Sequence, residues 1–234
     1  MRYDFLREDL ISNTCRDAIN RVSIFQTGMH KFKHCNPKQA AMRIAIFSGS
    51  FNPIHNGHLA IAREALAQDA ADELWFLVSP QNPLKKNIDL LPETDRLEMV
   101  KLAIGNETGM KASDFEFHLP RPTYTINTLE KLREHYPEHQ FKLLIGGDNL
   151  AIFQKWFQYK RIIDEFGLIV YPRPGFDTEN LPKFPNVTII TAPLIDLSAT
   201  EIREKLVNGE SITEMVPGKV ATFLQQHIKD PKNQ

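Results

Sequence analysis

From Arg43 onward the sequence alternates between short apolar runs and helical stretches, and this alternation constrains the fold more than any other feature. Such runs are typical of strands buried on both faces by helices. The predicted strands are Ile44–Ser48, Leu74–Val78, Lys111–Phe117, Phe141–Ile145, Gly167–Tyr171 and Val187–Ile190. The predicted helices are Gly57–Gln68, Pro92–Ile104, Thr125–His135, Trp156–Phe166, Ser198–Asn208 and Lys219–Lys229. The pattern predicts an α/β protein with a doubly wound, mostly parallel sheet and helices on both faces.

Met42 reads like the start of the functional part of the chain, because a β-rich run follows it at once. We expect residues 42–230 to form a single domain. Residues 1–41 lack clean periodicity and carry no recognisable chemistry. They are either an added helix and linker or upstream sequence translated ahead of the functional start, and we expect them to be dispensable for activity.

Charge and composition narrow the classes of partner. Residues 1–42 carry a net charge of +3 and the remainder −4, and an acidic body argues against a general nucleic-acid binder. No apolar run approaches the roughly 18 to 20 residues that a membrane-spanning helix needs. Cys15 and Cys35 form no CxxC pair, which favours reduced thiols and a cytoplasmic location. The sequence leaves a homo-oligomer open.

The turn after the first predicted strand carries the strongest chemical signal. It reads Gly49-Ser50-Phe51-Asn52-Pro53-Ile54-His55-Asn56-Gly57-His58 and leads into a helix. A helix start presents unpaired N–H groups and a positive dipole end, which suit an anion. His55 and His58 are three residues apart, so both can face that anion and donate to a phosphate. The alternative is that the two histidines merely cap the helix.

Other phosphate and metal signatures are missing from the sequence. It contains no GxxxxGK[ST] loop and no GxGxxG after the first strand. It also contains no HExxH and no CxxC pair, so we expect no dedicated metal site.

A second segment reads Leu197-Ser198-Ala199-Thr200-Glu201-Ile202-Arg203. Ser198 or Thr200 can cap a helix here, and Arg203 offers a planar fork for phosphate oxygens. By itself this segment is more typical of an ordinary capped helix with a solvated arginine.

Together the two segments resemble the GxFxPxHxGH and ISSTxIR signatures of the HxGH nucleotidyltransferase superfamily. Residues Arg121–Leu129 and Leu144–Leu150, with Trp156 close behind, resemble the PSYTxxTL and IIGxDxL stretches of the bacterial nicotinate-nucleotide adenylyltransferases. The likeness runs from Met42 to about Ile228 and implies a Rossmann-like nucleotidyltransferase domain. The implied reaction transfers AMP from ATP to nicotinate mononucleotide and releases pyrophosphate.

The resemblance also implies how ATP is held. His58 would contact the α-phosphate and stabilise the transition state, while His55 would help to hold the triphosphate. The other residues expected at the phosphates are Gly49, Ser50, Phe51, Ser198, Thr200 and Arg203. Mg²⁺ is the expected cofactor, and it would be carried mainly by the ATP phosphates and water.

The acceptor site is implied by other residues. Thr123, Tyr124 and Trp156 would frame the pyridine ring, although both aromatic residues could instead belong to the core. Asp148 would accept from a ribose hydroxyl, or would only cap a helix after Gly147. Lys85 could reach a phosphate, the alternative being a solvated loop.

Two positions depart from the family pattern. Leu84 stands where the family commonly has the histidine of a His-Lys pair, and Asn52 replaces a more usual aspartate. Two rival functions stay open: another adenylyl- or cytidylyltransferase of the superfamily, acting for instance on phosphopantetheine, and a nucleotide-binding regulator that has lost turnover.

Overall fold

Six parallel strands form one sheet in the order β3-β2-β1-β4-β5-β6. The computed structural model describes residues 40–80, 90–176, 182–193 and 197–228. The strands are β1 (Arg43–Gly49), β2 (Glu73–Val78), β3 (Met110–Ser113), β4 (Gln140–Gly146), β5 (Leu168–Tyr171) and β6 (Val187–Ile189). All the pairings between neighbouring strands are parallel, so the predicted doubly wound fold is confirmed.

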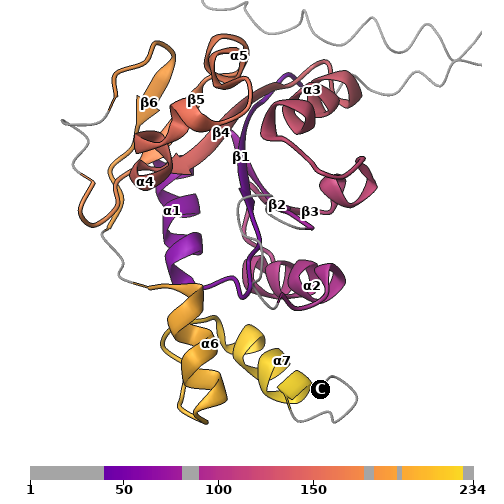
Figure 1. Cartoon of the computed structure of the whole chain (residues 1–234). Coiled ribbons are helices and arrows are strands. Elements are labelled where there is room, and N and C mark those ends of the chain that lie inside the picture. The colour runs from indigo at the N-terminus through magenta and orange to yellow at the C-terminus, as the bar shows by residue number, and fades with distance from the viewer. Residues whose placement is uncertain (1–39, 81–89, 177–181, 194–196, 229–234) are drawn as a thin grey trace, which may run out of the picture. The chain divides into compact units, whose positions relative to one another are not determined.

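Helices cover both faces of the sheet (Figure 1). The α-helices are α1 (Asn56–Ala67), α2 (Glu93–Ile104), α3 (Thr125–His135), α4 (Gly147–Ala151), α5 (Tyr159–Glu165), α6 (Ala199–Val207) and α7 (Gly218–Ile228). Two short 3₁₀ helices are η1 (Phe115–His118) and η2 (Phe153–Lys155). Within the described ranges, no helix is both long enough and apolar enough to cross a membrane.

Alternation along β1 shows why both faces need cover. Successive side chains of a strand point to opposite faces. Ala45 and Phe47 pack in a cluster with side chains of α1, α2, α6 and α7. Ile44 and Ile46 pack in a second cluster with side chains of α3, α4 and α5. Each fully buried isoleucine or phenylalanine side chain contributes about 1.5–3 kcal/mol to stability relative to an exposed one, so the clusters on both faces of the sheet are needed for stability.

Two element boundaries differ by more than two residues from those that the sequence predicts. The helix predicted from Trp156 begins only at Tyr159, because Gln158 has a φ of 53° in the left-handed region and interrupts it. The strand predicted over Lys111–Phe117 ends at Ser113, and the 3₁₀ helix η1 follows.

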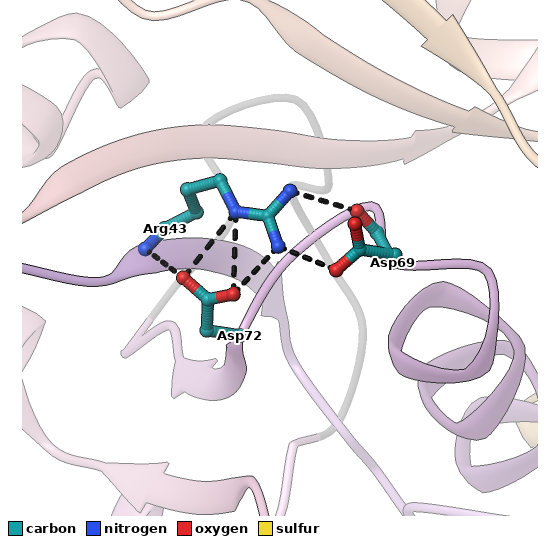
Figure 2. Close-up of polar contacts among 3 residues, drawn as sticks. All are labelled: Arg43, Asp69 and Asp72. Atoms are coloured by element: carbon teal, nitrogen blue, oxygen red, sulfur yellow. Dashed lines mark hydrogen bonds and ion pairs between the residues drawn. The ribbon is translucent and has the colours of Figure 1, made fainter. Parts of the chain in front are cut away.

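An arginine anchors the amino end of β1 (Figure 2). The backbone N–H of Arg43 donates to Asp72 Oδ2 at 2.7 Å. Its guanidinium donates to Asp72 Oδ1 and to Asp69 Oδ1, each at 2.6 Å. Arg43 holds the pKa of the Asp72 carboxyl below its usual value through these hydrogen bonds. The cluster ties β1 to the loop between α1 and β2, at the amino ends of the strands and therefore far from their carboxyl ends.

Candidate active site

The site lies at the carboxyl ends of the parallel strands, where open α/β sheets bind their ligands. The chain runs outward from β1 to β2 and β3 and then returns to β4 on the other side of β1, so the strand order reverses beside β1. A hollow at this edge is lined by the start of α1 and by the segment after β5. Its lining includes His55, Gly57, His58, Tyr171, Pro172 and Arg173.

The two histidines of the first turn stack on each other at the start of α1. Their ring centroids are 3.7 Å apart, with 28° between the ring planes. The backbone N–H of His55 donates to Nδ1 of His58 at 3.2 Å. Because Nδ1 accepts, a neutral His58 ring carries its proton on Nε2, and this N–H can serve as a donor to an oxyanion.

His55 is buried and uncharged in this site. Burial, with a smaller effect of the nearby Arg173 charge, lowers its pKa from 6.5 to about 4. The His55 side chain faces the backbone N–H of His58 in a capping box at the start of α1, but its buried Nδ1 atom makes no full hydrogen bond within the described part of the chain. A neutral imidazole at pH 7 can donate or accept a hydrogen bond, but it adds no positive charge before a phosphate arrives.

The side chain of Phe51 is buried in the hydrophobic core. Its ring packs with edge contacts against Phe47 and His58, at centroid distances of 5.8 Å and 5.2 Å. Its φ is 46°, in the left-handed region that bulky residues rarely adopt. Only its backbone N–H can therefore be offered to a ligand.

The packing of the Phe51 ring explains why a glycine stands at position 49. A Cβ at Gly49 would lie 3.1 Å from Cζ of the Phe51 ring. The sequence suggested that this glycine allows a ligand close to the backbone, and the structure adds the aromatic ring of Phe51 as a neighbour that needs the room.

The second motif reaches the first through Arg203 on α6. Its Nη1 donates to the carbonyl of Asn52 at 2.8 Å and to the carbonyl of Ala199 at 3.1 Å, and its Nη2 donates to Thr200 Oγ1 at 3.2 Å. Ser198 caps α6, since its Oγ accepts from the backbone N–H of Glu201 at 3.1 Å. Segments about 150 residues apart in the chain are thus joined beside the hollow, beyond the N-terminal end of α1 (Figure 1).

Asn52 fastens the same turn to the start of α2. Its Oδ1 accepts from the backbone N–H of Leu91 at 3.2 Å. The side chain is 2% exposed, so it acts within the turn and not at its surface.

Asp148 lies in the first turn of α4, directly after β4. Its Oδ1 atom is buried without a hydrogen-bond partner in the described structure, and Arg173 Nε lies 3.8 Å from it. A Cβ at Gly146 would lie only 2.3 Å from that Oδ1 atom. The glycine therefore leaves the space that the carboxylate occupies, and Oδ1, which is ion-paired with Arg173 but makes no hydrogen bond in the described structure, can accept from a ligand hydroxyl.

The segment predicted to bind the acceptor leads into α3. Tyr124 is 41% exposed, and its ring centroid lies 4.7 Å from that of Phe157, which is 50% exposed. Trp156 packs against Phe153 at 5.1 Å, and its Nε1 is buried without a partner among the described residues. Thr123 is partly buried. The well-exposed aromatic surface at this place is therefore made by Tyr124 and Phe157, while Trp156 is partly buried and packs against the core.

Three residues that matter to this geometry were missed by sequence reasoning. Arg173 lies two residues after Tyr171, in the loop beyond the carboxyl end of β5, and open α/β sheets bind ligands at such ends, so its charge was an available signal. Phe157 adjoins Trp156, and its aromatic character was likewise visible. Arg96 on α2 gave no signal, because a single arginine in a helix is usually solvated.

Lys85 and Leu84 lie outside the described residues. Among the residues that are described, no group of three or more His, Cys, Asp or Glu side chains could hold a metal ion.

Comparison with known proteins agrees with this geometry. The cytidylyltransferase-like family model matches residues 46–205. A probable nicotinate-nucleotide adenylyltransferase of Bacteroides fragilis is 49% identical over 188 residues, which is 80% of this chain and 94% of the relative. A relative of the same description from Cytophaga hutchinsonii is 46% identical, over 78% of this chain and 95% of its own length.

Solved structures show the same fold. The Plasmodium falciparum nicotinic acid mononucleotide adenylyltransferase complexed with NaAD superposes with a TM-score of 0.69 at 22% identity, over 80% of this chain and 96% of that one. The same enzyme complexed with APC gives a TM-score of 0.68 at 21% identity, with the same coverage. The sequence matches confirm the resemblance seen in the two motifs: this chain belongs to the cytidylyltransferase-like family and, within it, to the nicotinate-nucleotide adenylyltransferases.

Proposed function

We propose that this enzyme transfers AMP from ATP to nicotinate mononucleotide, giving nicotinate adenine dinucleotide and pyrophosphate. The single observation that carries the proposal is the contact of Arg203 with the carbonyl of Asn52, which joins the second motif to the histidine turn. The start of α1, the two imidazoles and Arg173 line one hollow, and Arg203 is bonded to the turn that leads into it. This arrangement suits a triphosphate, and the relatives' names supply the acceptor.

In the proposed reaction a 5′-phosphate oxygen of the mononucleotide attacks the α-phosphorus of ATP. The new bond forms as the bond to the bridging oxygen of the β-phosphate breaks, and pyrophosphate leaves with that electron pair. The attacking phosphate is already ionised at neutral pH, so no general base is needed. Alignment and neutralisation of the growing charge are the main requirements.

The site residues divide this task. His58, with its proton on Nε2, would donate to the α-phosphate as negative charge develops there. His55 and the backbone N–H groups of Ser50 and Phe51 would hold the triphosphate. From the start of α6, Ser198, Thr200 and Arg203 would bind the β- and γ-phosphates, and Gly49 keeps the turn compact.

The acceptor would lie across the sheet edge from the histidines. Tyr124 would contact the pyridine ring, with Thr123 as a hydrogen-bond donor to its carboxylate and Trp156 supporting the pocket wall. Oδ1 of Asp148, which makes no hydrogen bond within the described residues, is suited to a ribose hydroxyl. Lys85 stays a proposed phosphate contact.

Mg²⁺ is proposed as the metal. Its ligands would be oxygen atoms of the ATP phosphates and of water, and it would neutralise the charge of the phosphates. The described residues offer no ligand set of their own, so the fit to a protein-held metal is poor. We further propose that residues 42–230 are the working domain, that residues 1–41 are dispensable, and that the enzyme acts in the cytoplasm without nucleic acid or membrane partners. A homo-oligomer is compatible with the proposal.

The test is a panel of acceptors incubated with ATP and Mg²⁺, with pyrophosphate release as the readout. We expect nicotinate mononucleotide to be used far better than nicotinamide mononucleotide or phosphopantetheine. His58→Ala should lower kcat by about a hundredfold or more while the far-UV circular dichroism stays unchanged. Preference for another acceptor, or near-normal turnover of the folded variant, would refute the respective assignment.

A further inference from the structure

Arg96 is a buried cation held by main-chain carbonyl groups. The side chain is 1% exposed. Its guanidinium donates to the carbonyls of Ser50 at 2.6 Å, Ser79 at 2.7 Å, and Leu91 and Pro80 at 2.9 Å each. Only the planar fork of arginine can donate in several fixed directions at once, and a lysine ammonium cannot reproduce this pattern.

These carbonyls belong to the segments that build the site. Ser50 follows β1 in the histidine turn, Ser79 and Pro80 follow β2, and Leu91 leads into α2. Burial lowers the pKa of Arg96, which shows that a desolvation cost opposes its charge here. A cation buried at this cost and bonded to carbonyls of three segments fixes how these segments lie relative to one another.

The bond to Ser50 fixes the direction of the next N–H group. A trans peptide is planar, and its C=O and N–H groups point in opposite directions. Since the Ser50 carbonyl points to Arg96, the N–H of Phe51 points away from it. Phe51 has its φ of 46° and its ring beside His58, so this peptide is held from both sides.

A second buried ionisable residue lies close to the same carbonyls. Glu116 on η1 is 5% exposed and accepts from Thr128 Oγ1 at 3.0 Å. Burial raises the pKa of its carboxyl, and the side chain of Ser79 opposes this shift. Ser79, whose carbonyl accepts from Arg96, therefore lies between two buried ionisable side chains.

We infer that Arg96 is a positioning residue for adenylyl transfer, which orients the Ser50–Phe51 peptide so that the Phe51 N–H is presented to the triphosphate before ATP arrives. The inference rests on the proposed function. A donor that is already oriented needs no reorganisation when charge develops, which is why its loss lowers turnover more than its single hydrogen bond suggests.

The test compares Arg96→Lys and Arg96→Met with the wild-type enzyme, each assayed well below its own Tm. We expect kcat/KM for ATP to fall by about tenfold or more in both variants, while KM for nicotinate mononucleotide changes by less than about threefold. Lysine keeps the charge but not the fork, so it should not rescue. Arg161→Met is the matched control, because that guanidinium is exposed on α5 and should leave both constants unchanged.

A purely structural role for Arg96 predicts a different result: a lower Tm with kcat/KM for ATP within about twofold of wild type, and that result would overturn the inference. An independent measurement on the wild-type protein covers the case in which neither variant folds. On titration with ATP and Mg²⁺ without acceptor, the amide resonance of Phe51 should shift in ¹⁵N spectra. No shift at Phe51 while the His58 ring resonances move would refute the inference and leave the proposed function standing. Failure of the wild type to release pyrophosphate would instead refute the function.

Discussion

The neutral state of His55 predicts a measurable dependence of stability on pH. Its pKa falls from 6.5 in the unfolded chain to about 4 in the folded protein, because burial disfavours the charged ring. Between these values the unfolded chain binds a proton that the folded protein does not. The stabilisation is therefore fully present above pH 6.5 and is lost as the pH falls toward 4.

The magnitude follows from the size of the shift. About 2.5 pKa units at 1.36 kcal/mol each give about 3 kcal/mol of stability lost below pH 4, of which about 2 kcal/mol is already lost at pH 5. Urea unfolding at pH 8, 6 and 5 measures this loss. His55→Asn removes the titrating ring, so the variant should lose about 2 kcal/mol less than wild type between pH 8 and pH 5.

The difference between the two proteins isolates His55. Hydrogen bonds from Arg43 and Arg161 lower the pKa values of Asp72 and Glu165 respectively. Protonation of these carboxylates in acid destabilises both proteins equally, so their contribution cancels in the difference. His118→Asn, at a side chain that is 74% exposed, controls for removal of an imidazole as such. If the free energy of unfolding changes with pH by the same amount in wild type and His55→Asn, within about 0.5 kcal/mol, the conclusion that His55 is buried in its neutral form is refuted.

Three further predictions address other parts of the site. Arg203→Ala should raise KM for ATP by about tenfold, because it removes a charge from the proposed phosphate site and frees the Asn52 turn; an unchanged affinity in a calorimetric titration would contradict this. Gly146→Ala should place a Cβ where Asp148 Oδ1 lies, so kcat/KM should fall by about tenfold, and a crystal structure with Asp148 in place would count against the argument. Phe157→Ala should raise KM for nicotinate mononucleotide with little change in KM for ATP, because Phe157 supports the Tyr124 ring; equal changes in steady-state kinetics would argue against it.

The sequence predicted the sheet well because its strands are buried on both faces. Runs such as Leu74–Val78 admit few other structures, and the strand matches to within one residue. The helix predicted from Trp156 began too early, since helical spacing of apolar residues cannot reveal the left-handed backbone at Gln158. The short helix α4 was missed, because its five residues are too few to show a period.

The site was predictable to the extent that its donors sit in local patterns. His55, His58 and Arg203 stand in two short motifs, and the fold brings those motifs together. The packing reasons behind Gly49 and Gly146 were not visible, since they depend on the ring of Phe51 and on the carboxylate of Asp148 meeting the glycines in space.

Arg96 illustrates why such partners escape a reading of the sequence. A motif names the groups that touch a ligand, and the direction of those groups depends on contacts made from elsewhere in the chain. The carbonyls that Arg96 binds belong to residues up to 46 positions away, and a carbonyl has no sequence identity that a pattern could display. A main-chain donor such as the Phe51 N–H is therefore recognisable from its own motif, while the residue that aims it becomes visible only when the buried hydrogen bonds of the fold are followed one by one.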